Sequence, residues 1–330
     1  MSLSLAFLGC GWATRLHSRT LRAFGRDVQR YYASRDAARA RQYNERYGGA
    51  GAFPSYDEGI ADPRVQAVLV ATPPSTHLDL TLRALRGGKH VIVEKPAFPR
   101  SADFDTVAAA EQESGRRVLV AENYYYKPIT RRLRGIVRSG ALGEILFVHV
   151  NALKLQRADD WRGDATLAGG GALFEAGIHW IDFIANLGLQ VRSVRGLRPG
   201  REATAGAAEK SILVSIEYAE GAVGVLSYSW EIPSLYGLRV SRIYGREGSV
   251  TFESNGVFLV QSGRRKAFVI PGVRDLAGYR AMFADFVRAL STGAPTEFTL
   301  AHARRDVELV EQVYRSLPVA YDGTSRLESR

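Results

Sequence analysis

The chain of 330 residues has one cysteine, six lysines and no long apolar run. A disulfide needs two thiols, so the lone Cys10 excludes an internal disulfide and any cysteine-based metal site, and we predict no metal. No apolar stretch approaches the roughly 20 residues of a membrane span. The first residues lack a basic leader and run directly into a glycine motif, which is not the pattern of a signal peptide. We therefore expect a cytoplasmic protein without membrane contact.

The charge is positive but scattered. The 44 basic residues include 38 arginines, and the net charge of +10 invites comparison with nucleic-acid-binding proteins. Residues 1–122 carry 17 basic and 13 acidic side chains, and the remainder carries 27 and 21, so both halves share the excess. There is no basic tail. We interpret the charge as a mild preference for small anionic ligands, and we expect no nucleic-acid partner.

The length and the hydrophobic pattern predict two domains. In residues 1–122, strand and helix patterns alternate, which predicts an α/β Rossmann domain with a doubly wound parallel sheet. In residues 123–330, hairpin turn signals link successive strands, which predicts an α+β domain with an open, mainly antiparallel sheet. The expected strands are 3–8, 28–33, 65–71, 90–93, 117–121, 143–155, 191–197, 210–218, 222–231, 238–244, 249–252, 257–260 and 267–270. The expected helices are 12–24, 36–47, 76–86, 102–114, 128–139, 173–187, 276–290 and 300–317.

A glycine turn after the first expected strand indicates a dinucleotide site. Gly9 permits the tight turn, and Gly11 lets a pyrophosphate approach the backbone N–H groups of the following helix. Trp12 and Ala13 begin that helix. Thr14 stands where the usual fingerprint has a third glycine, so looser strand–helix packing is expected there.

The end of the second strand bears on the choice between NADP and NAD. Ser34 offers a hydroxyl and Arg35 a guanidinium to a 2′-phosphate, which favours NADP(H). The alternative is that Ser34 caps a helix, Arg35 is solvated and Asp36 binds the ribose of NAD.

Two further turns face the same crevice. Thr72 and Pro73 follow the third strand and are predicted to line the nicotinamide side, with His77 lining the crevice or capping the next helix. Glu94 and Lys95 end the following strand, and Pro96 biases Lys95 toward extended geometry. An ammonium on this rigid support points into the crevice where α/β sheets bind ligands.

A glycine-rich block precedes the second candidate site. Three glycines at 169–171 lead into Glu175, His179 and Asp182, which fall at i, i+4 and i+7 on one face of the expected helix. The plainer interpretation is a solvated helix face with a Glu–His pair, which gives no reason for three glycines upstream.

Taken together, these motifs resemble the Gfo/Idh/MocA family of sugar and inositol oxidoreductases over nearly the whole length. The resemblance rests on Gly9-Cys10-Gly11 with His17, Thr72-Pro73-Pro74 with His77, Glu94-Lys95-Pro96, Glu122-Asn123 with Pro128, residues 140–145, Trp161-Arg162, and the block from Gly169 to Asp182.

The resemblance implies roles for individual residues. Lys95 would bond the reacting hydroxyl or carbonyl, and His179 would be the general base in oxidation and the acid in reduction. Glu175 stands where the family usually has aspartate, and it would orient His179 or contact a substrate hydroxyl. The implied substrate-binding residues are Asn123, Tyr125, Trp161, Arg162 and Asp182, although Tyr125 fits a core or interface cluster equally well.

The predicted function is an NADP(H)-dependent oxidoreductase that acts on a secondary alcohol or ketone of a sugar, sugar derivative or cyclitol. The resemblance also implies a homodimer or homotetramer formed through the C-terminal sheet. A non-catalytic NAD(P)-sensing regulator on the same fold is the alternative. An enzyme that keeps its cofactor bound between half-reactions is a third possibility that the sequence does not separate from ordinary turnover.

Overall fold

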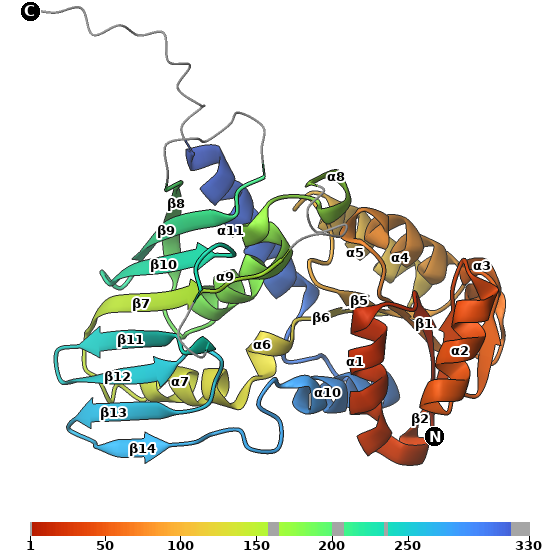
Figure 1. Ribbon diagram of the computed structural model, residues 1–330, viewed down its shortest axis with the longest axis horizontal. Coiled ribbons are helices and arrows are strands. Elements are labelled where there is room, and N and C mark those ends of the chain that lie inside the picture. The colour runs from red at the N-terminus through yellow and green to blue at the C-terminus, as the bar shows by residue number, and fades with distance from the viewer. Residues whose placement is uncertain (1, 158–164, 200–207, 234–236, 318–330) are drawn as a thin grey trace, which may run out of the picture.

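The computed structural model describes residues 2–157, 165–199, 208–233 and 237–317. Figure 1 shows two sheets, a parallel one formed by the N-terminal part of the chain and a larger one formed by the C-terminal part. The expectation of a Rossmann domain joined to an open-sheet α+β domain is confirmed. Within the described ranges, no helix is both long and apolar enough to cross a bilayer.

The N-terminal sheet has six parallel strands in the order β3-β2-β1-β4-β5-β6. Its central strands are buried on both faces, which explains their continuous apolar sequences. The strand order reverses between β1 and β4, and ligands of such sheets bind at this point, outside the carboxyl ends of the strands. The elements are β1 Leu3–Leu8, α1 Trp12–Leu21, β2 Val28–Ala33, α2 Ala37–Tyr47, β3 Gly51–Phe53, α3 Tyr56–Ala61, β4 Ala67–Val70, α4 His77–Arg86, β5 His90–Glu94, α5 Asp103–Ser114 and β6 Val118–Ala121. Strand β3 and helix α3 were not predicted, because each is too short to show a hydrophobic period.

The C-terminal sheet has eight strands in the order β14-β13-β12-β11-β7-β10-β9-β8. All neighbours are antiparallel except β7 and β10, which run parallel at its centre. One face is buried against helices that include α9 and α11, and the other is open. The elements are α6 Asn123–Tyr126, α7 Pro128–Arg138, β7 Ile145–Leu153, α8 Ala165–Ala168, a π-helical turn Leu173–Gly177, α9 Ile178–Ala185, β8 Val191–Leu197, β9 Ser211–Tyr218, β10 Val223–Ser229, β11 Val240–Gly245, β12 Gly248–Glu253, β13 Leu259–Gly263, β14 Ala267–Val269, α10 Tyr279–Thr292 and α11 Leu300–Ser316.

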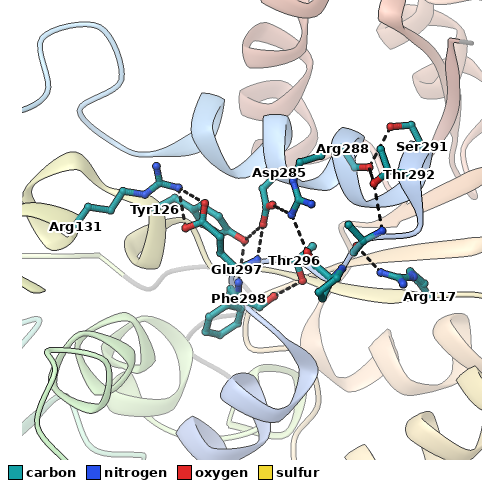
Figure 2. Close-up of polar contacts among 12 residues, drawn as sticks. Arg117, Tyr126, Arg131, Asp285, Arg288, Ser291, Thr292, Thr296, Glu297 and Phe298 are labelled. Atoms are coloured by element: carbon teal, nitrogen blue, oxygen red, sulfur yellow. Dashed lines mark hydrogen bonds and ion pairs between the residues drawn. The ribbon is translucent and has the colours of Figure 1, made fainter. Parts of the chain in front are cut away.

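Helix α10 returns to the N-terminal domain and packs on α1 and α6. Figure 2 shows the polar network that fixes this return. The buried carboxylate of Asp285 accepts hydrogen bonds from the hydroxyl of Tyr126 and the backbone N–H of Glu297, both at 2.8 Å. The same hydroxyl accepts the N–H of Phe298 at 3.2 Å. The junction helix α6 is therefore tied to the segment between α10 and α11.

Candidate active site

A cavity of about 510 Å³ lies at the carboxyl ends of β1, β2, β4 and β5. All the residues predicted to bind the cofactor line it except His77. Arg39 and Tyr56 also line it and were not predicted, and Glu175 lines it together with Lys95. The full lining is Gly9, Cys10, Gly11, Trp12, Ala13, Ser34, Arg35, Asp36, Arg39, Tyr56, Ala71, Thr72, Pro73, Pro74, Glu94, Lys95 and Glu175.

The glycine turn leaves room for a dinucleotide. Gly9 has φ +110°, and a Cβ there would collide with the carbonyl oxygen of Ala71, so only glycine fits. At Gly11 a Cβ would meet no described atom within 4 Å, and the space beside this residue is the cavity itself. The backbone N–H groups that start α1 border this space, which suits a pyrophosphate. Thr14, in place of the third glycine, is fully buried and its hydroxyl donates to the Gly9 carbonyl at 2.6 Å, and the looser strand–helix packing expected there stays a prediction.

The adenosine end of the cavity is basic. Arg35 and Arg39 line it together with Tyr56. The Ser34 hydroxyl accepts the N–H of Asp36 at 3.2 Å. The carboxylate of Asp36 accepts two N–H groups from the first turn of α2, at 2.9 and 3.2 Å, so Asp36 and not Ser34 caps the helix.

His77 does not line the cavity, which corrects its predicted place there. Its ring is fully buried, and Nδ1 contacts the carbonyl oxygens of Pro96 and Ala97 at 3.0 and 3.1 Å, while Nε2 contacts that of Thr72 at 2.9 Å. Burial lowers the pKa of this histidine. The imidazole thus ties the turn after β4 to the turn after β5, and so positions residues that do face the cavity.

Lys95 occupies the end of β5 on a buried support. Beneath it, the Glu94 carboxylate pairs with the buried His17 and accepts the Lys95 N–H at 3.1 Å. Burial opposes ionisation of Glu94, but His17 and Lys95 together lower its pKa. The Lys95 ammonium donates to the carbonyl oxygen of Glu175 at 2.8 Å, and Oε1 of Glu175 lies 3.9 Å away.

The glycine block has a steric explanation. The predicted single helix over 173–187 is wrong in its first part, where Leu173–Gly177 form a π-helical turn before α9. A Cβ at Gly171 would collide with the carboxylate of Glu209, whose Oε1 accepts the Leu173 N–H and the Tyr314 hydroxyl, each at 2.8 Å. Glu209 thereby holds the start of the π turn, a feature often found at functional sites.

His179 is oriented by Glu122, a carboxylate that the sequence analysis did not place in the site. Nδ1 of His179 lies 2.6 Å from Oε1 of Glu122, which also accepts the N–H of Tyr124 at 2.9 Å. Nδ1 is thus held by Glu122, while Oε1 of Glu175, in the π turn, lies near Lys95, and the role of Glu175 toward His179 or a substrate hydroxyl stays a prediction. The sequence feature that could have indicated Glu122 is its place, as an acidic residue at the carboxyl end of a predicted parallel strand.

The Glu122–His179 pair shares protons. Burial raises the pKa of Glu122 to about 8. Burial, reinforced by the Lys95 ammonium, lowers the pKa of His179 well below its usual value. When Glu122 is ionised and the imidazole is neutral, Nδ1–H donates to Oε1 and Nε2 keeps its lone pair. That arrangement has one proton on the pair, on Nδ1. A second proton, on Glu122 or on Nε2, disfavours it.

Three of the predicted substrate-binding residues are engaged elsewhere. The Asn123 amide donates to the Ala277 carbonyl at 2.7 Å. The centroid of the Tyr125 ring lies 3.9 Å from the guanidinium carbon of Arg134 and 5.3 Å from the centroid of the tilted Phe298 ring, which favours the core-cluster alternative. Asp182 is fully buried, and burial together with neighbouring carboxyl groups raises its pKa, which favours the protonated form. Trp161 and Arg162 lie outside the described residues.

Tyr124 and not Tyr125 contacts His179. Its ring stacks on the His179 imidazole with 4.2 Å between centroids and 9° between planes. Among the described residues, no group of three or more metal-binding side chains gathers.

A glycine turn, a strand order of 3-2-1-4-5-6 and a lysine beside a paired histidine define a nucleotide-binding oxidoreductase. Comparison with known proteins gives the family. The N-terminal domain described as "Oxidoreductase family, NAD-binding Rossmann fold" matches residues 3–122, and the GFO/IDH/MocA C-terminal domain matches residues 130–251. The chain belongs to the Gfo/Idh/MocA oxidoreductase family.

Individual relatives cover most of the chain. It is 29% identical to dTDP-3,4-didehydro-2,6-dideoxy-alpha-D-glucose 3-reductase of Streptomyces violaceoruber, over 85% of each chain. It is also 29% identical to inositol 2-dehydrogenase of Acidothermus cellulolyticus, over 88% of this chain and 86% of that one. Among solved structures, GenD2 from gentamicin A biosynthesis in complex with NAD superposes with a TM-score of 0.83 at 28% identity, covering 98% of this chain and 95% of that chain.

Proposed function

We propose that this protein transfers a hydride between NADP(H) and a secondary alcohol or ketone of a sugar, sugar derivative or cyclitol. The observation that carries the proposal is the convergence of two groups from different domains. Lys95 lines one end of the cofactor cavity, and its ammonium is close enough to His179 to lower the pKa of that imidazole. The names of the relatives, a dTDP-sugar reductase and an inositol dehydrogenase, support a polyhydroxylated substrate.

The site residues have separate proposed roles. The turn from Gly9 to Ala13 would hold the pyrophosphate, and Thr72 and Pro73 would border the nicotinamide, which supplies the hydride chemistry when bound. The Lys95 ammonium donates a hydrogen bond to the reacting oxygen and stabilises its negative charge. Nε2 of His179 takes the hydroxyl proton in oxidation and returns it in reduction. Glu122 holds Nδ1 and so fixes which nitrogen faces the substrate.

The preference for NADP(H) is supported by the groups at the adenosine end. Arg35 and Arg39 line the cavity there, beside the hydroxyl of Ser34. Guanidinium groups match a 2′-phosphate geometrically and electrostatically. Asp36, the carboxylate that would suit the ribose of NAD, also lines the cavity, and its Oδ1 caps α2.

Self-association through the C-terminal sheet is supported by its open face. Phe147 on β7 pairs in register with Val223 on β10, so both side chains lie on one face, and each is 49% exposed. Val240 on β11 and Phe268 on β14 continue this face at 38% and 66% exposure. Apolar exposure of this kind suits a second copy of the chain.

The alternative of a cofactor-sensing regulator predicts binding without turnover. The test is to incubate the purified protein and NADP⁺ with one class of substrate at a time, namely cyclitols, free aldoses or nucleotide-linked sugars. The absorbance of the reduced nicotinamide is followed in each mixture. We expect turnover with one class, and its loss in Lys95→Met and His179→Ala proteins that still quench cofactor fluorescence. Cofactor binding without turnover on any of the three classes would contradict the proposal and favour the regulator.

A further inference from the structure

The short helix α6 places a second layer of groups behind the base. The Tyr124 ring stacks on His179, and the Lys127 ammonium lies 4.1 Å from the centroid of the same ring. The His179 imidazole, stacked with 4.2 Å between ring centroids, fills the space over one face of the Tyr124 ring. Lys127 must therefore lie on the opposite face. The three groups form a stack in the order ammonium, phenol ring, imidazole.

Lys127 is buried, with 4% of its surface exposed. Its alkyl chain passes beside Gly256, where an added Cβ would lie 3.4 Å from Lys127 Cε. The charged groups that face it are Glu253 and Arg239 from the sheet and Glu122 from its own segment. Burial lowers its pKa to about 8, so the amine is mainly cationic at neutral pH.

An ammonium on one face of an aromatic ring affects what the other face accepts. The face of a phenol ring carries partial negative charge that attracts one cation. The Lys127 ammonium already interacts with the partial negative charge of the Tyr124 ring. An imidazolium on the opposite face would compete for the same charge and would be repelled by the ammonium. A neutral imidazole stacks there without this conflict.

We propose that Tyr124 and Lys127 are positioning residues for the base: the ring fixes the plane of the His179 imidazole, and the ammonium behind it disfavours the imidazolium. The consequence for catalysis rests on the proposed function; the effect on the imidazole does not.

Other charges also act on His179, from every element around it. Lys95 directly after β5 and Lys154 after β7 disfavour the imidazolium, whereas Glu175 in the π turn, Glu94 on β5 and the partner Glu122 favour it. Lys127 lowers the pKa of Glu122 directly, as these charges act on His179, but toward the imidazole itself it acts across the Tyr124 ring. Its effect should therefore depend on the ring.

This dependence gives the test. The imidazole of His179 is titrated by NMR in isotope-labelled, cofactor-free protein, with the resonance assigned from His179→Gln. We expect Lys127→Met to raise the apparent pKa of the imidazole by about one pH unit, and Lys127→Arg, which keeps a cation, to leave it near the wild-type value. The matched control is Lys89→Met, which removes another buried ammonium, one that donates to the carbonyl oxygens of Asp62 and Val65 far from the site.

A double-mutant cycle separates a specific effect from general loosening. Tyr124→Phe keeps the ring and should preserve the Lys127→Met shift, whereas Tyr124→Leu should reduce it to the part that acts through Glu122. A shift of the same size in the Tyr124→Leu background, or none in the wild-type background, would overturn the proposal.

Kinetics then connect the stack with turnover. In the oxidation direction, Lys127→Met should move the pH inflection upward by the same amount as the NMR titration, and Tyr124→Leu should lower kcat by about 10-fold with KM nearly unchanged. If the NMR shifts occur but no substrate is turned over, the proposed function fails and the stack stands. If turnover occurs and the inflection does not follow the NMR shift, the stack has no role in the reaction.

Discussion

The imidazole of His179 and the carboxylate of Glu122 share a hydrogen bond of 2.6 Å between residues 57 positions apart. Glu122 directly follows the last strand of the parallel sheet, and His179 lies on α9 beneath the other sheet. The bond therefore crosses the junction between the two folds. The orientation of the proposed base therefore depends on how that junction is held, and the hydrogen bond between Tyr126 and Asp285 lies at the same junction.

The first prediction concerns pH. Oxidation needs a lone pair on Nε2, so its rate should rise with pH as the Glu122–His179 pair loses a proton around pH 8, and reduction should fall over the same range. In Glu122→Gln the amide still accepts Nδ1–H but does not titrate. The imidazole then titrates alone, at lower pH, because burial and Lys95 lower its pKa.

The acid-side inflection of kcat/KM for oxidation should accordingly move to lower pH, and the plateau should fall by about 10- to 100-fold as the base weakens. Glu113→Gln, an amide substitution on the exposed surface of α5, is the control and should leave the profile unchanged. An inflection that stays in place in Glu122→Gln would remove Glu122 from this role.

The second prediction concerns Lys95. Replacing it with methionine removes the cation that stabilises charge on the reacting oxygen, and kcat/KM should fall by about 10²- to 10³-fold while the Kd for cofactor changes little. Steady-state kinetics and fluorescence titration measure the two quantities separately. Lys266→Met, on the exposed turn before β14, is the matched control. Equal losses in affinity and turnover would mean that Lys95 only binds cofactor.

Most of the architecture could be predicted from local patterns. The alternation of apolar strands and amphipathic helices predicted the parallel sheet, and the hairpin turns predicted the antiparallel one. The glycine turn predicted which strand ends line the cavity, because Gly9 and Gly11 act through their own backbone geometry. Lys95 was predicted in the same way, because the carboxyl ends of parallel strands meet at one edge of the sheet, where the cavity lies.

The partners of these residues could not be predicted, because tertiary packing sets them. A helical period put Glu175 four residues before His179, but it gave no sign that the chain forms a π turn there or that Glu122 would hold Nδ1. Three consecutive tyrosines gave no basis for preferring Tyr124 over Tyr125. The difference arises because Arg134 and Phe298 engage Tyr125, while α9 brings His179 to Tyr124.

The third prediction concerns the cofactor. If Arg35 and Arg39 contact a 2′-phosphate, Arg35→Ala with Arg39→Ala should weaken NADPH binding by about 10- to 100-fold and change NADH binding much less. Fluorescence titration of the apo-protein with each cofactor measures this. Arg41 lies on α2 with Arg39 but does not line the cavity, so Arg41→Ala should change neither affinity. Equal weakening for both cofactors would place the two arginines at the pyrophosphate, and wild-type preference for NADH would contradict the 2′-phosphate assignment.

The fourth prediction concerns the open face of the C-terminal sheet. Phe147 lies on the central strand β7, opposite Val223 on one neighbour and Tyr244 on the other. A carboxylate at position 147 would have to be desolvated if this face packs against a second copy, so Phe147→Glu should dissociate the assembly. Light scattering after gel filtration measures the mass. Val273→Glu changes a residue that is 86% exposed in the loop after β14, and it should leave the mass unaltered. A wild-type monomer at micromolar concentration, or an oligomer that Phe147→Glu leaves intact, would show that the assembly does not depend on this face.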